Sequence, residues 1–156
     1  MRLQRVLVVI GVAVALIVAG MGYTYYIDVA AIRDSRVVME DARLTELSFT
    51  QATLAIQVTI SNPSSRDIAD LTVSFDILIS ETFVGNGSFP SLTIPAHDLR
   101  TREMNVTLYF AELASAVIAA IQQGTFLIMM QGTVKGRVMF GLTTFSQSFS
   151  SSYAFP

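Results

Sequence analysis

The side chains best suited to catalysis are few, and we expect none of them to form an active site. His97 is the only histidine, and thus the only side chain whose ordinary pKa lies near neutrality. Asp98 follows it directly, but neighbouring residues in a turn seldom face each other, and no serine or threonine stands in a nucleophile-elbow context. Cysteine is absent, which excludes thiol catalysis and thiolate metal sites. We therefore predict a protein that is not an enzyme.

Acidic and glycine residues that suggest a metal or phosphate site have the wrong spacing for either. Asp67, Asp70 and Asp76 are not spaced as in a calcium-binding loop, and we expect them on the polar rim of the domain. Residues 85–87 (Gly-Asn-Gly) do not open a helix, as a phosphate-binding loop would, so they predict a hairpin turn. The sequence predicts neither a metal ion nor any other cofactor.

Two sequons are candidate glycosylation sites. Asn86 begins Asn-Gly-Ser and Asn105 begins Asn-Val-Thr, whereas the pattern at Asn62 is blocked by Pro63. Sequons are frequent by chance, so they add little to the argument for export. That argument depends on the start of the chain.

The first strong feature of the chain is Val6–Tyr26, twenty-one residues without a charge. As an α-helix it would be about 31 Å long, close to the thickness of the hydrocarbon core of a bilayer. Arg2 and Arg5 precede it, and three of its last four residues are tyrosine. This arrangement is typical of a span with a cytoplasmic N-terminus and an aromatic belt at the outer surface. We expect a cytoplasmic N-terminus (1–5), a transmembrane helix in contact with the lipid bilayer (6–26), a juxtamembrane helix or linker (27–36) and an extracytoplasmic domain (37–156).

A cleaved signal peptide is the alternative for this stretch. Residues 6–18 would then be its apolar region, with Ala19, Gly20 and Gly22 as the small residues near the cut. We favour the uncleaved anchor, because the apolar run is long and a cleavage site has no use for tyrosines. The rest of the chain is exported in both cases.

Small residues recur every four positions in the span, at Gly11, Ala15 and Ala19. Such a stripe allows two transmembrane helices to pack closely. Glycine and alanine are common in spans anyway, so this is only a candidate helix–helix contact.

The exported part is apolar and weakly acidic. Apolar residues make up 52% of the whole chain and charged residues 14%, which excludes disorder for most of its length. From Ile27 onward there are 8 basic and 12 acidic residues, a net charge of −4, and Lys135 is the only lysine. We therefore expect no nucleic-acid partner.

Apolar residues at every second position predict strands through most of the domain. The pattern over 126–140 places Phe140 on the same inward face as Val134 and Val138. Period two with one apolar face indicates antiparallel sheets that share a core. We expect strands over 37–49, 52–61, 71–80, 102–110, 126–140 and 145–155, with further turns at 62–65 and 95–98.

One segment, 111–123, has a helical pattern instead. Leu113, Val117 and Ile121 follow at four-residue spacing, and Gly124 is a suitable C-cap. The sequence thus predicts a mainly all-β protein: a fibronectin-III- or Ig-like antiparallel sandwich of about seven strands, with one inserted helix that covers an open end, preceded by one transmembrane helix.

The order of elements resembles the late-embryogenesis-abundant group 2 domain, also called the WHy domain, over residues 37–155. The most specific element is Val-Thr-Ile-Ser-Asn-Pro at 58–63, a strand that ends in Asn-Pro; Ser64 stands where the family commonly has asparagine. Residues 83–89 and the Ile-Pro-Ala at 94–96 also match. The resemblance implies a fibronectin-III-like sandwich, no known catalysis, and a role in desiccation or stress protection or in defence-related signalling. Plant hairpin-induced-like members also join one N-terminal span to such a domain.

Four residues are predicted to have structural roles: Asn62, Pro63, Gly87 and Pro95. Proline ends a strand by removing a hydrogen-bond donor, and an asparagine side chain can satisfy backbone groups in the turn that follows.

We consider two functions. The first is a membrane-anchored, non-enzymatic domain for stress or desiccation protection or for maintenance of the cell envelope. The second is a structural or adaptor subunit that docks on a surface layer, a filament or a membrane complex. Few lysines protect the strand edges, so an edge strand is a candidate site for a protein partner. The aromatic residues of the serine-rich tail (146–153) suit a paired edge, but a normal closing strand with its aromatics in the core is the simpler interpretation.

Overall fold

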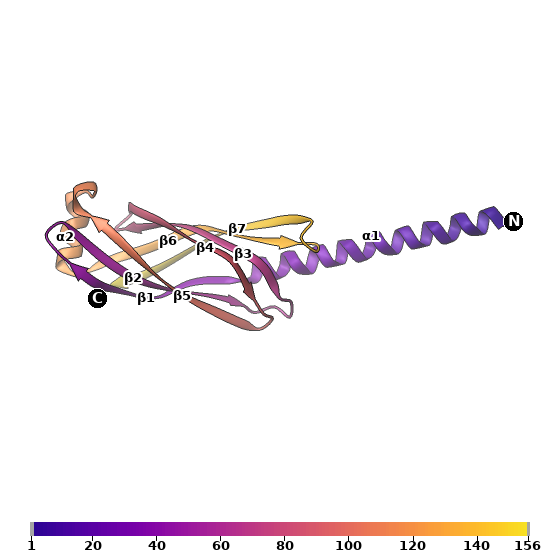
Figure 1. Cartoon of the computed structure of the whole chain (residues 1–156), viewed down its shortest axis with the longest axis horizontal. Coiled ribbons are helices and arrows are strands. Elements are labelled where there is room, and N and C mark those ends of the chain that lie inside the picture. The colour runs from indigo at the N-terminus through magenta and orange to yellow at the C-terminus, as the bar shows by residue number, and fades with distance from the viewer. Residues whose placement is uncertain (1, 156) are drawn as a thin grey trace.

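A single long helix leads into a β-domain. The computed structural model describes residues 2–155. Met1, Pro156 and the side chains at positions 2, 3 and 5 lie outside this description. All of these except Pro156 belong to the expected cytoplasmic end. Helix α1 (Arg2–Asp34) has 33 residues and is thus about 50 Å long. Most of it projects from the domain (Figure 1). From Val6 to Asp34 it is long and apolar enough to cross a membrane.

The residues expected as a juxtamembrane helix or linker, 27–36, continue α1 to Asp34 and enter the first strand at Arg36. Nothing in this segment breaks a helix, and its alanines favour one. Ser35 caps the end, since its Oγ donates a 2.6 Å hydrogen bond to the carbonyl oxygen of Ile32. The helix therefore passes directly into the domain.

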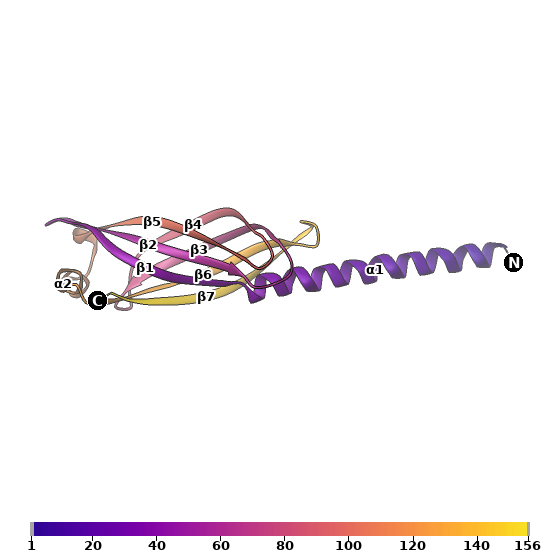
Figure 2. The same ribbon diagram turned by 90° about the horizontal axis from the view of Figure 1, so that it is seen from below.

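The domain is a sandwich of seven antiparallel strands in two sheets, as the alternating patterns predict (Figure 2). Every hydrogen-bonded pair of neighbours is antiparallel. The three-stranded sheet has the order β1 (Arg36–Leu47), β2 (Gln51–Asn62) and β5 (Asp98–Tyr109). The four-stranded sheet has the order β4 (Thr82–Ile94), β3 (Ile68–Ile79), β6 (Phe126–Val138) and β7 (Thr143–Phe155).

The core lies between the sheets and consists of the inward residues of each strand. On β2 and β3 the predicted inward residues are almost completely buried, among them Leu54, Ile56, Val73 and Ile77. The end of α1 joins this core, because Ala31 and Ile32 are also buried in it.

The predicted hairpin turn at 85–87 is wrong. Gly85, Asn86 and Gly87 lie within β4, opposite Ile77, Asp76 and Phe75 of β3. The turn is instead formed by the two residues between the strands, Ser80 and Glu81, which both have positive φ angles (48° and 67°). Gly87 is needed for packing: a Cβ there would lie 2.6 Å from the Met104 side chain and 2.8 Å from the Phe75 ring.

The inserted helix is present but shorter than expected. A 3₁₀ turn (Phe110–Glu112) precedes α2 (Ser115–Gln123). Gly124 is its C-cap, with a φ of 73° and an N–H that donates to the carbonyl oxygens of Ala120 and Ile121 at 3.1 Å. Val117 and Ile121 are buried. The helix lies at the end of the sandwich opposite α1 (Figure 1), which we call the distal end; the end at α1 is the proximal end.

The serine-rich tail is a closing strand. Phe145, Phe149 and Tyr153 of β7 pack against the core, while the serines at 146, 148, 150 and 152 are exposed and Ser151 is half-buried. One long side of the sandwich is closed by contacts between β7 and β1. The Met39 N–H donates to Ser151 Oγ at 2.9 Å, and Tyr153 donates to the Asp41 carboxylate at 3.3 Å.

Asp41 also accepts a 2.6 Å hydrogen bond from Arg43, and the guanidinium lowers the pKa of that carboxyl below its usual range. β4 and β5 stand at the opposite long side, each at the edge of its sheet.

Phe140 is the one residue of the apolar pattern over 126–140 that does not point inward. β6 ends at Val138, and Phe140 lies in the turn to β7 with its side chain 80% exposed. Met139, Phe140 and Gly141 all have positive φ angles, so the strand period does not continue through them.

Candidate functional site at the junction of helix and sandwich

Asp28 joins α1 to two loops at the proximal end. One carboxylate oxygen accepts a 2.8 Å hydrogen bond from Arg66 Nε in the β2–β3 loop. The other accepts a 2.8 Å hydrogen bond from the Met139 N–H in the β6–β7 turn. Only 12% of the Asp28 side chain is exposed, so the ion pair is screened less than one on the open surface.

Ile32, one helical turn further on, inserts between the sheets. Its side chain is 1% exposed and lies against β6. At the point of contact β6 has Gly136, where a Cβ would lie 2.6 Å from Ile32 Cδ1 and 3.4 Å from Leu71 Cδ1. The glycine thus leaves the space that the helix occupies.

Asn62 organises the neighbouring loops. Its side chain is buried, and its Nδ2 donates to the carbonyl oxygens of Arg66, Ile94 and Pro95 at 2.7, 3.1 and 3.0 Å. Its Oδ1 accepts from the N–H and the hydroxyl of Ser64 at 3.1 and 2.7 Å. One side chain therefore holds the β2–β3 loop against the β4–β5 loop.

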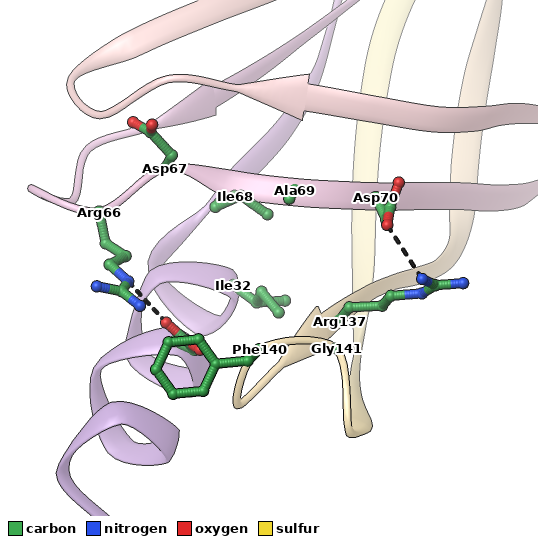
Figure 3. Close-up of a pocket in the computed structure, with 10 residues that line it drawn as sticks. Ile32, Arg66, Asp67, Ile68, Ala69, Asp70, Arg137, Phe140 and Gly141 are labelled. Carbon is green, nitrogen blue, oxygen red and sulfur yellow. Dashed lines mark hydrogen bonds and ion pairs between the residues drawn. The ribbon is translucent and has the colours of Figure 1, made fainter. Parts of the chain in front are cut away.

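Between these contacts lies a shallow cleft of about 280 Å³. Arg66 is paired with Asp28 at one side, and Arg137 is paired with Asp70, at 3.4 Å, at the other. Figure 3 labels Arg66, Arg137 and Asp70. A third carboxylate, that of Asp67, accepts a 2.8 Å hydrogen bond from the Ala96 N–H. The charged groups of the cleft are thus already bound to protein partners, and the described residues contain no group of three or more metal-ligating side chains.

Three of the four residues predicted to be structural meet here. Asn62 bonds directly to Pro95, and Pro63 ends β2 beside them. Gly87 lies elsewhere, in the middle of β4.

The structure separates the groups that could suggest catalysis. The Asp98 carboxylate binds Arg100 at 2.9 Å and its own neighbour, the Leu99 N–H, at 2.8 Å, while His97 is exposed. Asp76 lies on the outer face of the four-stranded sheet, apart from Asp67 and Asp70 in the cleft.

The remaining candidate residues all lie on the surface. Asn86 and Asn105 are exposed on β4 and β5. Gly11, Ala15 and Ala19 lie in the exposed part of α1.

Sequence reasoning missed Asp28, Ile32 and Gly136. Asp28 is the first charge after twenty-two uncharged residues, which is a signal in itself. Ile32 is separated from Asp28 by one turn, a spacing that places both on one helix face. Gly136 gave no signal, because only the three-dimensional contact shows what approaches it.

Comparisons with known proteins show a similarity in fold alone. No family model matches the chain, and no curated protein matches its sequence. The solution structure of an Arabidopsis thaliana protein is similar, with 18% identity over 75% of this chain and 78% of that one and a TM-score of 0.58.

A Bordetella pertussis protein described as ApaA has 16% identity over 79% of this chain and 94% of its own, with a TM-score of 0.53. A solution structure described as a late embryogenesis abundant protein has 14% identity over 95% of this chain and 88% of its own, with a TM-score of 0.44. At these identities the likeness concerns the β-sandwich fold alone.

Proposed function

We propose that this chain is a single-pass membrane protein whose non-enzymatic β-sandwich is held outside the cytoplasm, where it protects against stress or desiccation or maintains the cell envelope. One observation carries the proposal: the same helix is apolar and exposed over its first part and buried in the domain core at its end. An exposed apolar helix needs a bilayer, and a docked end holds the domain at the bilayer surface.

The charged groups support a role without catalysis. In the proximal cleft, Asp28 and Asp70 are bound to arginines and Asp67 to a backbone N–H. A general acid or base needs a group that is free to exchange a proton with a substrate. These carboxylates instead hold loops together.

The stress-related role is supported by the resemblance in residues 58–63. In such domains a strand ends in Asn-Pro, and here Asn62 makes five hydrogen bonds that fix the proximal loops. A domain whose loops are fixed in this way suits a protective role at a membrane surface.

Labelling single-cysteine variants tests the proposed orientation, since the chain has no cysteine of its own. Gln4→Cys is exposed near the start of α1, and Phe49→Cys is fully exposed at the distal end. We expect a membrane-impermeant maleimide to label Phe49→Cys in intact cells and Gln4→Cys only after permeabilisation. The reverse pattern would place the domain in the cytoplasm and overturn the proposal.

Protection is measured on the full chain in vesicles that also hold a desiccation-sensitive test enzyme. We expect more enzyme activity after drying and rehydration than in vesicles with an equal mass of an unrelated single-pass protein. Equal losses in both samples would count against the protective role.

An adaptor subunit is the second candidate, and the β4 edge favours it. β4 lies at the edge of its sheet and contains no charged residue, whereas β5 at the facing edge has Arg100, Arg102 and Glu103. Charged residues protect edges against pairing, so β4 is the edge that accepts an added strand more readily.

Affinity purification from detergent-solubilised membranes separates the two candidates. A stoichiometric partner supports the adaptor role. That partner should be lost with Asn86→Lys and Ser88→Lys, which place charges on β4, but retained with Ser148→Lys and Ser150→Lys, which place them on the exposed face of β7. Recovery of the chain alone supports the protective role.

A further inference from the structure

The β6–β7 turn presents two large apolar side chains to solvent at the proximal end. Phe140 is 80% exposed and Leu142 70% exposed. Single exposed apolar residues are common on protein surfaces, so exposure alone decides nothing. What distinguishes this pair is its attachment to α1 and its place in the fold.

The turn has a defined backbone conformation. The Gly141 N–H donates to the carbonyl oxygen of Val138 and the Leu142 N–H to that of Met139, both at 3.2 Å. Met139 and Phe140 have φ angles of 57° and 58°, in a region that residues with a side chain rarely adopt. The fold thus holds Phe140 in the turn although a glycine or asparagine would suit the backbone better.

The hydrogen bond from the turn to Asp28 fixes the position of the β6–β7 turn along the axis of α1. It accepts the Met139 N–H, and it follows Tyr26 by two residues, about 3 Å along the helix axis. Tyr23 and Tyr26 are exposed on α1 just before this point. Tyrosines at the end of a span lie at the level of the lipid headgroups.

The turn also points toward the expected membrane. In both ribbon views it reaches further along α1 toward the N-terminus than the other proximal loops (Figures 1 and 2). Phe140 lines the same cleft as Arg66 and Asp28 of α1 (Figure 3).

We propose that the β6–β7 turn inserts Phe140 and Leu142 into the interfacial layer of the same bilayer that α1 crosses. This inference rests on the proposed membrane anchoring and adds a second point of contact. A single helix can tilt and rotate in the bilayer and carries the docked domain with it, whereas a second contact, displaced to one side of the helix, fixes the orientation of the domain. Because Arg66 and Arg137 are paired with aspartates, the contact is apolar and needs no anionic lipid.

Tryptophan fluorescence tests this directly, because the chain contains no tryptophan. Three single-tryptophan variants of the full chain are reconstituted into phosphatidylcholine nanodiscs, with and without brominated lipid. Val14→Trp reports the middle of α1, Phe140→Trp the turn, and Phe49→Trp the distal end. Leu142→Trp is a second reporter in case Phe140→Trp does not fold.

We expect brominated lipid to reduce the emission of Val14→Trp and Phe140→Trp at least twofold and to leave Phe49→Trp unchanged. If Val14→Trp is quenched but neither turn variant is quenched more than Phe49→Trp, the anchoring stands and the turn contact is wrong. If Val14→Trp is not quenched, α1 does not span, and both proposals are overturned.

Discussion

Gly136 on β6 leaves the space that Ile32 on α1 fills: a methyl group on the glycine Cα would lie 2.6 Å from Ile32 Cδ1. A helix that is exposed and apolar at its start is thereby fixed to the sandwich at its end. The contact couples the two parts of the chain more directly than a linker would, because moving the helix requires opening the core.

Gly136→Ala should therefore destabilise the protein. Either Ile32 or the strand must shift, and overpacking of this kind costs about 1–3 kcal/mol. The measurement is urea unfolding of the full chain in detergent, followed by far-UV circular dichroism. Gly85→Ala is the matched control, since its Cβ would have Val106 at an ordinary 3.7 Å and should change stability by less than about 0.5 kcal/mol.

Ile32→Val tests the contact itself, because it removes the Cδ1 atom that meets the added methyl group. Alone it should cost about 1 kcal/mol, as similar buried substitutions do. When Ile32→Val is added to Gly136→Ala, the double variant should be about as stable as Gly136→Ala alone, or more stable. Strictly additive losses would mean that the two residues do not compete for the same space.

Asn62→Ala should lower stability by about 2–3 kcal/mol without removing any partner. It leaves the carbonyl oxygens of Ile94 and Pro95 without the Nδ2 donor in a site that water barely reaches. Thermal unfolding and the affinity purification above measure the two effects on one sample. Asn105→Ala, at an exposed asparagine on β5, outside the β4 edge, should leave both unchanged. A normal melting temperature with a lost partner would make Asn62 a binding residue.

Sequence patterns predict the sandwich well because burial imposes period two. Leu54, Ile56, Val73 and Ile77 lie inward as their spacing requires, and Gly124 caps α2 as expected. Phe140 fits the same period but lies in a turn, since the strand ends two residues earlier. Periodicity does not show where a strand stops.

The glycines mislead for a related reason. Gly85 and Gly87 flank an asparagine, a pattern typical of turns, yet Gly87 is small because the Phe75 ring needs the space. Ser80 and Glu81 form the real turn although neither residue is typical of it. At the junction, Asp28, Ile32 and Gly136 come from elements far apart in sequence, and local patterns contain no information about such contacts.

The ion pair between Asp28 and Arg66 should have a measurable coupling energy. A double-mutant cycle with Asp28→Asn and Arg66→Gln isolates it, and we expect about 1 kcal/mol, above the few tenths usual for exposed pairs. Asp34→Asn with Arg33→Gln is the control, because both of these side chains are more than half exposed. Equal coupling energies in the two cycles would show that burial at the junction does not strengthen the ion pair.

The β3–β4 hairpin offers a stabilising change. Ser80 and Glu81 both have positive φ angles, the conformation of a type I′ turn, for which Asn-Gly is the preferred pair. Replacing them by Ser80→Asn and Glu81→Gly should raise the free energy of unfolding by roughly 1 kcal/mol, because the native backbone then carries less strain. Glu103→Gly in the middle of β5, where φ is not positive, should instead lower it, since glycine weakens a strand interior. If the double variant is no more stable than the natural chain in urea unfolding, the turn does not have this conformation.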